Sequence, residues 1–374
     1  MSLRICWLVI SMTSKPQFGG EKVKLSDLCS KGKSSLRQKD LLNDGPYLVY
    51  GASGVIGTMS CYQNEEPYVA VVKDGAGVGR VMACKGKSSV LGTMQALLPS
   101  KNVDLNYLLH LVRSLKLGDD FSGSTIPHIY FRDYGEREVP AIAIKQQIMI
   151  AGVLDKIEMM LARLDMTLKK QDQLVKSRFV EMFGSIVDNP KCWQTLPLSI
   201  AAPVDYKAFP EEDRVWQLTL DAVESMSGSV FSKTYAEAAE LKGSIGGFDS
   251  SQVLYSKLRP YLNKVVVPDS SGVCTTELLP LSPLENVVNK VYLATALRSS
   301  EFVTFASNHS SGAKMPRIDM KAFRSFELPI PPLELQQEFA DFVAQVDKSG
   351  FAVRKQIKKL QLLYDSLAQE YFGD

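Results

Sequence analysis

The sequence has 374 residues, enough for two or more domains that each bury a core. Its 22% of charged and 45% of hydrophobic residues are those of an ordinary soluble globular protein, which excludes a fibrous or largely disordered chain. The formal net charge is only +2, so overall charge does not identify a partner.

The six cysteines and three histidines are scattered along the chain. They show no CxxC pair and no metal-ligand spacing, so we predict no metal site. Isolated cysteines without a secretory signal indicate a reducing cytoplasm. The apolar start "RICWLVISM" is too short to span a bilayer. We therefore expect residues 1–20 to be an N-terminal extension, with Met12 as an alternative start, and no membrane contact.

Short β-branched runs separated by Gly, Pro and Asn follow in residues 21–142. They predict strands in "GPYLVYGASGVIGTMSCY" and "PYVAVV", with one short helix at "YLLHLVRS". Residues 190–330 repeat this plan, with strands at "QVLYSKL" and "KVVVP" and a helix at "YLATALRS". Each of these regions is therefore predicted to be a mixed α+β domain.

Apolar residues recur in alternating steps of three and four in residues 143–189 and again in 331–374. Members of the two stripes are Leu154, Leu161, Leu168, Val353, Leu360 and Leu367. Such stripes are typical of helices, here about 30 residues long, that pair along a narrow seam. Because loops must return between the two copies, we predict an antiparallel pair. The alternative is that each stripe faces its own domain.

The second half of the chain repeats the first in order. The aligned pairs are "YVAVVKDGAGVGRV" (68–81) with "QVLYSKLRPYLNKV" (252–265), "NYLLHLVRS" (106–114) with "VYLATALRS" (291–299), "SGSTIPHI" (122–129) with "SGAKMPRI" (311–318), "IAIKQQ" with "PPLELQQ", and "FVEMFG" with "AQEYFG". Five weak matches in one order indicate a tandem duplication.

The glycines of "VAVVKDGAGVGRV" raise the question of a nucleotide site. The Walker loop GxxxxGK[ST] and the dinucleotide fingerprint GxGxxG both fail, and a strand pattern follows where both motifs open a helix. The second copy has "LRPYLN" where the first has "DGAGVG", a replacement that a phosphate cradle could not survive. We therefore interpret the glycines as the tip of a hairpin.

Catalytic patterns are otherwise absent from the sequence. Glu240, Lys242 and Asp221 superficially look like the acidic set of a metal nuclease, but they have no counterpart in the first copy. No glycine-rich S-adenosylmethionine loop is present. The sequence therefore indicates a non-catalytic protein, without catalytic residues of its own.

The repeat and its motifs resemble the specificity (S) subunit of type I restriction–modification systems, over about residues 21–374. The segments that carry the resemblance are "VLYSKLRPYLNKV", "TTELLPL", "SGAKMPRI" and "IPPLELQQEF" in the second copy, and "YGASGVIG", "VAVVKDGAGVGRV" and "SGSTIPHI" in the first. The resemblance implies an α+β fold in which two similar target-recognition domains are separated by two long antiparallel helices. These helices form a coiled-coil-like spacer, and the chain has a pseudo-two-fold internal repeat.

The implied domains are an extension (1–20), target-recognition domain 1 (21–142), helical spacer 1 (143–189), target-recognition domain 2 (190–330) and helical spacer 2 (331–374). The implied partners are double-stranded DNA, methyltransferase (M) subunits and a restriction (R) subunit. S-adenosylmethionine, ATP and Mg²⁺ would belong to those subunits, and this chain would hold no cofactor. From Ile148 to Phe183 a helix would extend about 54 Å, or on the order of 15 base pairs of duplex.

Candidate DNA contacts come from the hairpins and the aligned loops: Lys73, Arg80, His128, Lys257, Arg259, Tyr261, Lys264, Lys314 and Arg317. Arginine can bind guanine O6 and N7 with two donors, whereas lysine more often contacts phosphate. Structural roles for Lys73, Lys257, Arg259 and the lone His128 remain open. Candidates on the spacer helices, for capping or for a partner subunit, are the seam residues above with Gln146, Gln147, Gln336 and Gln337.

Two further functions remain open at this stage. One is a non-catalytic adaptor that carries two sugar- or peptide-binding domains on a coiled coil. The other is a cryptic nuclease or methyltransferase that uses Glu240 and Lys242.

Overall fold

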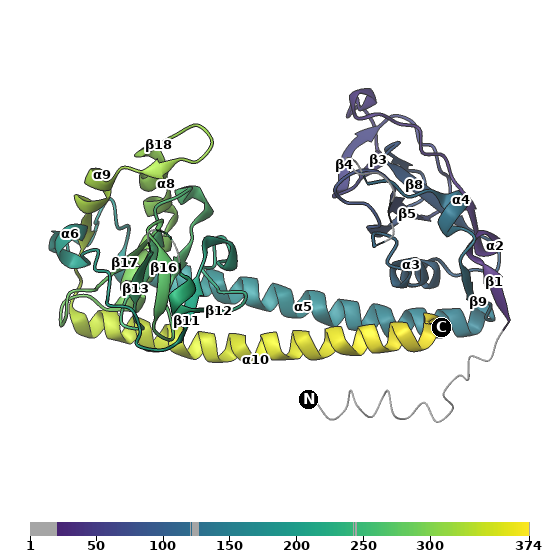
Figure 1. Cartoon of the computed structure of the whole chain (residues 1–374). Coiled ribbons are helices and arrows are strands. Elements are labelled where there is room, and N and C mark those ends of the chain that lie inside the picture. The colour runs from purple at the N-terminus through teal and green to yellow at the C-terminus, as the bar shows by residue number, and fades with distance from the viewer. Residues whose placement is uncertain (1–20, 120, 122–126, 242, 244, 374) are drawn as a thin grey trace. The chain divides into compact units, whose positions relative to one another are not determined.

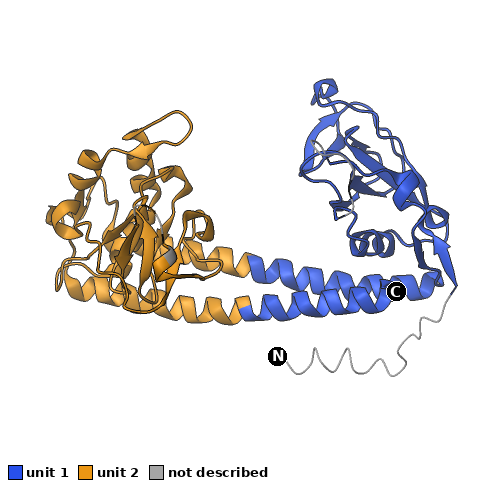
Figure 2. Ribbon diagram, viewed as in Figure 1, with its two compact units in different colours: residues 1–165, 355–374 blue, residues 166–354 orange. Residues whose placement is uncertain are grey.

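The structure is a computed structural model, and it describes residues 21–119, 121, 127–241, 243 and 245–373. The extension predicted at 1–20 and most of the loop "SGSTIPHI" lie outside the described residues. The chain forms two compact units, which are residues 1–165 with 355–374, and residues 166–354 (Figure 2). Both boundaries fall inside long helices, so the limits predicted for the recognition domains stay predictions.

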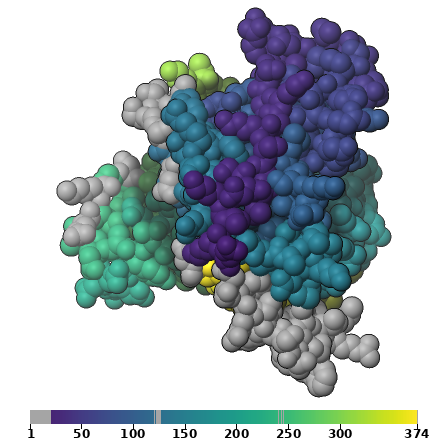
Figure 3. Space-filling view, turned by 90° about the vertical axis from the view of Figure 1, so that its right-hand side faces the viewer, coloured from purple at the N-terminus to yellow at the C-terminus, as the bar shows by residue number. Residues whose placement is uncertain are grey.

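Unit 1 contains a four-stranded sheet, a three-stranded sheet and a strand pair (Figure 1). Their orders are β2-β8-β5-β6, β4-β3-β7 and β1-β9. The bounds are β1 (Lys22–Lys24), β2 (Cys29–Lys31), β3 (Tyr47–Gly51), β4 (Gly54–Met59), β5 (Tyr68–Val72), β6 (Val81–Cys84), β7 (Ser89–Val90), β8 (Met94–Pro99) and β9 (Glu138–Pro140). The helices are α2 (Leu25–Leu28), η1 (Gln38–Asp40), α3 (Leu105–Ser114) and α4 (Phe131–Tyr134). The space-filling view looks onto this unit, whose first described residues, in purple, run over its face (Figure 3).

Unit 2 contains sheets in the orders β12-β11-β16-β13 and β15-β14-β17, and the pairs β10-β20 and β18-β19. The strand bounds are β10 (Thr195–Pro197), β11 (Arg214–Leu218), β12 (Thr234–Glu237), β13 (Ile245–Phe248), β14 (Val253–Ser256), β15 (Val265–Val266), β16 (Gly272–Thr275), β17 (Leu278–Leu281), β18 (Ser310–Ser311), β19 (Arg317–Ile318) and β20 (Glu327–Pro329). The helices are α6 (Leu198–Ala201), η2 (Leu220–Ala222), η3 (Ala238–Glu240), η4 (Pro260–Leu262), α7 (Lys290–Arg298), α8 (Ser300–Asn308) and α9 (Met320–Arg324).

The topology confirms the internal repeat. In unit 1, β5 pairs antiparallel with β6 and with β8, and in unit 2, β14 pairs in the same way with β15 and with β17. The strand pairs β1-β9 and β10-β20 also correspond, and α3 and α7 both follow the sheet strands as predicted. Two copies of one plan therefore fold into two units with the same central strands.

Two long helices, α5 (Ile144–Phe183) and α10 (Leu333–Phe372), run through both units (Figure 1). Each has 40 residues, and is thus longer than the seam predicts. The end of α5 also packs against the rest of unit 2: Phe183 lies against Tyr292 of α7, with ring centroids 4.9 Å apart. Among the described residues, no helix is both long and apolar enough to cross a membrane.

The helices pack antiparallel, as predicted. In unit 2, the Gln171 amide donates to the Ser349 hydroxyl at 3.0 Å, and Arg178 donates to Glu338 at 2.9 Å. In unit 1, Leu154 of α5 shares a core with Leu367 of α10. Leu154 and Leu367 are buried, and the other predicted seam residues Leu161, Leu168, Val353 and Leu360 are half-buried. These contacts between helices favour the paired arrangement over stripes that face only their own domains.

The glycine-rich stretch is a hairpin tip, as the sequence predicts. It connects the antiparallel strands β5 and β6, and Gly75 (φ 90°) and Gly79 (φ 81°) have left-handed backbones. In unit 2 the aligned residues are Arg259 and Asn263, and both have φ 49°. The backbone bond from residue 78 to 75 recurs as the bond from 262 to 259. The two tips therefore share one backbone path despite their different sequences.

We predict that Gly79→Ala destabilises unit 1 much more than Gly75→Ala does. A Cβ on Gly79 would lie 2.2 Å from the backbone nitrogen of Gly118, whereas a Cβ on Gly75 meets nothing within 4 Å. Backbone strain costs each variant about 1–2 kcal/mol. Overpacking adds about 1–3 kcal/mol to Gly79→Ala alone. Hydrogen exchange of the β5 and β6 amides measures both losses, and equal losses would contradict the close approach.

Candidate nucleic-acid interface

In unit 1, the hairpin tip is joined to the loop that ends "SGSTIPHI". The Gly75 N–H donates to the Pro127 carbonyl at 3.1 Å, and the Ile129 N–H donates to the Lys73 carbonyl at 2.9 Å. The His128 imidazole Nδ1 lies 2.7 Å from a carboxylate oxygen of Asp74. The structure thus brings together Lys73 and His128, two candidate contacts that are far apart in the sequence.

In unit 2, the same junction is built from the aligned residues. The Arg259 N–H donates to the Pro316 carbonyl at 2.7 Å, and the Ile318 N–H donates to the Lys257 carbonyl at 3.0 Å. We call each of these regions a hairpin–loop junction; it comprises residues 73–75 with 127–129 in unit 1, and residues 257–259 with 316–318 in unit 2. Seven of the nine candidate DNA contacts lie in a junction or within four residues of one along the chain.

Several candidate cations are already bound by the protein itself. The Arg317 guanidinium donates to both carboxylate oxygens of Glu277 at 3.0–3.2 Å, and this hydrogen-bonded ion pair raises the pKa of Arg317. The Lys264 ammonium donates to the Leu220 carbonyl at 2.7 Å. In unit 1, Arg80 is exposed, although one of its nitrogens donates to the Ala52 carbonyl at 2.7 Å. Some lysines and arginines of the sequence therefore bind acceptors within the protein, and fewer remain to contact phosphate.

Arg259 is the N-cap residue of η4. It holds the left-handed turn before Pro260, and its guanidinium Nη2 donates weakly to the Lys314 carbonyl at 3.4 Å. Its Nε is buried and has no hydrogen-bond partner among the described residues. By contrast, the side chains of Tyr261 and Lys314 are exposed beside it. Of the candidates in this turn, these two are the ones in position to reach a ligand.

A buried glutamine at the start of each long helix fixes that helix to its unit. The Gln336 side chain accepts from the Asn289 N–H at 2.8 Å and donates to the carbonyls of Val287 (2.9 Å) and Pro331 (2.8 Å). Asn289 is the N-cap of α7. Gln336 therefore supplies hydrogen-bond partners to backbone groups that precede α7 and α10.

Gln147 makes the same three bonds in unit 1. It accepts from the N–H of Asp104, the N-cap of α3, at 2.9 Å, and donates to the carbonyls of Asn102 (3.2 Å) and Ile142 (2.9 Å). Gln147 and Gln336 are buried and stabilise the fold through these hydrogen bonds. Gln146 and Gln337 are the exposed members of the two pairs, and they alone could meet a partner subunit.

In each unit an arginine that the sequence did not single out binds the hairpin: Arg113 in unit 1 and Arg298 in unit 2. Arg113 donates to the Val81 carbonyl at 3.4 Å and pairs with Glu158 of α5 at 2.5 Å. The aligned Arg298 donates from Nε to the aligned Val265 carbonyl at 3.1 Å. The only signal in the sequence is the shared position of the two arginines in "LVRS" and "ALRS".

Arg298 is half-buried, so its charge benefits from nearby acids. Burial lowers the pKa of Arg298, and the nearby carboxylates of Asp347 and Asp172 oppose that shift. Burial also raises the pKa of Asp347. Both acids lie on the long helices, one on α10 and one on α5. The guanidinium that binds the hairpin of unit 2 thus interacts electrostatically with acids on both helices.

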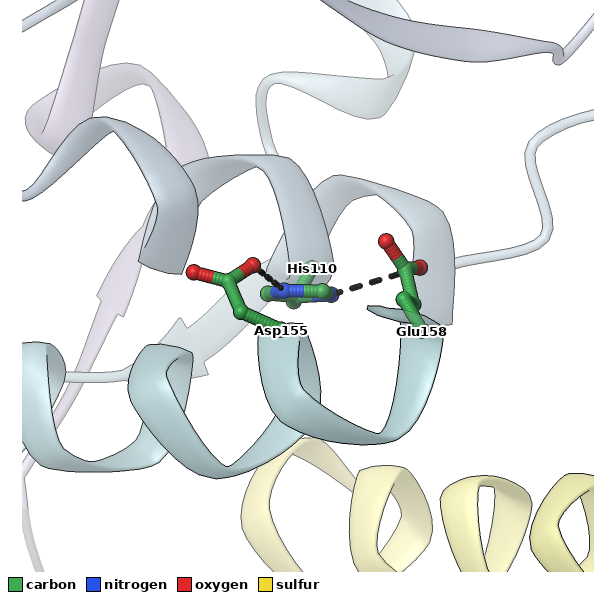
Figure 4. A group of neighbouring side chains, drawn as sticks. All are labelled: His110, Asp155 and Glu158. Carbon is green, nitrogen blue, oxygen red and sulfur yellow. Dashed lines mark hydrogen bonds and ion pairs between the residues drawn. The ribbon is translucent and has the colours of Figure 1, made fainter. Parts of the chain in front are cut away.

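Asp155 and Glu158 of α5 lie on either side of His110 of α3 (Figure 4). The imidazole Nε2 is 2.8 Å from Asp155, while Nδ1 is 2.9 Å from the Tyr364 hydroxyl of α10 and 3.9 Å from Glu158. Ligand atoms of these three residues lie within 4.8 Å of one another, a grouping that sequence spacing did not predict.

The contacts of this cluster join α3 to the long helices and leave no carboxylate free for a cation. Arg113 already pairs with Glu158, and the Asn106 amide donates to the second oxygen of Asp155 at 2.8 Å. A cation bound here would have to displace a guanidinium that carries the same charge sign. The nuclease-like set cannot be placed in the same way, because Lys242 and the side chain of Glu240 lie outside the described residues.

Comparison with known proteins agrees with this architecture, two repeated units on one pair of antiparallel helices. The family described as "Type I restriction modification DNA specificity domain" matches residues 19–171 and 264–361, more than half of the chain. The chain therefore belongs to this family. The Escherichia coli "Type I restriction enzyme EcoDI specificity subunit" is 23% identical over 391 aligned positions, which cover 94% of this chain and 85% of that protein.

Solved structures show the same fold. The crystal structure of the S subunit of a type I restriction–modification system from M. genitalium matches with a TM-score of 0.59 and 15% identity, covering 96% of this chain and 98% of that one. A chain from a solved type I R-M system matches with a TM-score of 0.52 and 14% identity, covering 94% and 97%. The architecture predicted from the resemblance is confirmed.

We predict that Gln336→Ala destabilises unit 2 by about 2–4 kcal/mol, because it leaves one N–H and two carbonyls buried without partners. The exposed neighbour gives a matched control, Gln337→Ala, for which we expect less than about 1 kcal/mol. Urea unfolding of the full chain, followed by hydrogen exchange in α7, measures both. Equal destabilisation of the two variants would contradict the role of the Gln336 hydrogen bonds in fixing α10 to unit 2.

Proposed function

We propose that this chain is the specificity subunit of a type I restriction–modification complex and that each unit reads one half of a bipartite duplex DNA site. The observation that carries the proposal is the hairpin–loop junction, which is built twice with the same backbone bonds but different side chains. A major-groove face displays a distinct donor and acceptor pattern for each base pair. Two junctions with different side chains would therefore read two different half-sites.

The chemistry of the complex would lie in other subunits. Methyltransferase subunits would bring S-adenosylmethionine, and a restriction subunit would bring ATP and Mg²⁺. This chain would act without catalysis and without a cofactor. The name of the Escherichia coli relative supports the assignment, since that protein is a specificity subunit of a restriction enzyme. A DNA partner and free buried thiols at Cys29, Cys84 and Cys274 support a place in the cytoplasm.

The long helices would set the spacing between half-sites. A continuous helix of 40 residues extends about 60 Å, on the order of 18 base pairs. The near-neutral charge of the chain supports a division of labour in which partner subunits supply many of the phosphate contacts.

The test is to prepare the chain alone and together with a methyltransferase subunit encoded beside it. We expect feeble DNA binding by the chain alone and nanomolar binding of a split site by the complex. Methylation mapping on a plasmid library identifies the site. Nanomolar specific binding by the isolated chain, or methylation of a continuous site, would contradict the proposal.

We predict that Arg317→Ala relaxes one half-site while the other half-site keeps its preference. The pairing of Arg317 with Glu277 adds a second expectation, for Glu277→Gln. Freeing the guanidinium should strengthen non-specific binding and increase the magnitude of the salt slope by about 1. Binding titrations of the complex at several salt concentrations measure both. An unchanged methylation specificity in Arg317→Ala would remove this residue from the interface.

A further inference from the structure

The tip of unit 2 exposes apolar side chains from three neighbouring segments. Met226 is 57% exposed, Tyr261 50% and Met315 53%. The Met226 N–H donates to the Leu262 carbonyl at 3.0 Å, which joins the turn around 226 to η4. The loop that holds Met315 is joined to the start of η4 by the bond from the Arg259 N–H to the Pro316 carbonyl. We call Met226, Tyr261 and Met315 the apolar tip.

The apolar tip continues the hairpin–loop junction of unit 2, where several donors already have partners within the protein. Lys264 donates to a backbone carbonyl, and Nε and Nη2 of Arg317 donate to the Glu277 carboxylate. The Arg259 guanidinium is held against the loop. This surface therefore exposes two thioethers and a phenol ring beside Lys314 and the Glu277-paired Arg317.

We propose that unit 2 recognises thymine in its half-site through contact of the apolar tip with the 5-methyl group; this inference rests on the proposed function. Thymine is the base that displays an apolar group in the major groove. Methionine is flexible and polarizable, so an exposed thioether can pack against a methyl group. Lys314, beside Met315, would supply a phosphate contact that holds the tip in the groove.

Unit 1 presents a different surface at the equivalent position. Gly77 aligns with Tyr261, and the described tip from Gly75 to Gly79 has no methionine and no aromatic ring. The half-site read by unit 1 therefore serves as an internal reference, which substitutions in the apolar tip should leave unchanged.

The experiment uses the complete complex with a methyltransferase subunit and a randomised duplex library. The enriched site is then resynthesised with single thymines replaced by deoxyuridine, which lacks only the methyl group. We expect affinity to fall roughly fourfold for each contacted thymine, the effect of one buried methyl group. Replacement of the same thymine by 5-iodouracil, followed by irradiation, should crosslink to the peptide that contains Tyr261 or Met315 and so assign the half-site to unit 2.

Variants complete the test. Met315→Gln and Met226→Gln keep side-chain length but remove the apolar surface, and we expect each to bind thymine and deoxyuridine sites equally. Met159→Gln is the matched control, because Met159 is also half exposed (50%) but lies on α5 in unit 1. It should keep the fourfold difference.

The outcomes separate the two proposals. If the complex enriches no split site, the proposed function fails. If it enriches a split site whose unit 2 half contains no thymine, or binds deoxyuridine as well as thymine there, only the recognition of thymine is overturned. Loss of the methyltransferase subunit from Met315→Gln during purification would also overturn it, because the apolar tip would then be a protein interface.

Discussion

Burial of polar side chains between the sheet-bearing parts and the long helices is the constraint on which the structure depends. A buried glutamine or guanidinium is stable only while every hydrogen-bond partner stays in place. Gln147 and Gln336 bind the N-cap residues of α3 and α7, and Arg113 and Arg298 bind the second strand of each hairpin. Directional bonds thus specify the orientation of each hairpin on its helices. Apolar packing alone would leave the hairpin free to shift along them.

Local patterns in the sequence predicted the parts of the fold that local physics decides. The a/d stripes gave the seam of α5 and α10, because burial along a helix repeats with the helical period. The hairpin at Gly75–Gly79 followed from turn chemistry and from comparison of the two copies. Missing from the prediction were contacts such as His110 with Asp155, because a bond between residues 45 positions apart leaves no periodic trace in the sequence.

The candidate site shows the same division. Residue types suggested candidate DNA contacts, and the aligned copies identified the two loops that the structure joins to the hairpins. The sequence could not show which cations the protein itself uses, because that depends on acceptors elsewhere in the fold. Lys264 binds the carbonyl of Leu220, and Arg317 binds Glu277. Exposure, which made Met226 and Met315 notable, is likewise a property of the folded chain.

The matched left-handed residues of the two tips have a consequence for how specificity changes. Each tip has a left-handed residue at either end, positions 75 and 79 in unit 1 and 259 and 263 in unit 2. Each pair encloses three residues. Those enclosed residues, Ala-Gly-Val in one copy and Pro-Tyr-Leu in the other, differ completely while the backbone path is retained. If the tip contacts DNA as proposed, new side chains can be exchanged at these three positions while the backbone that presents them is kept.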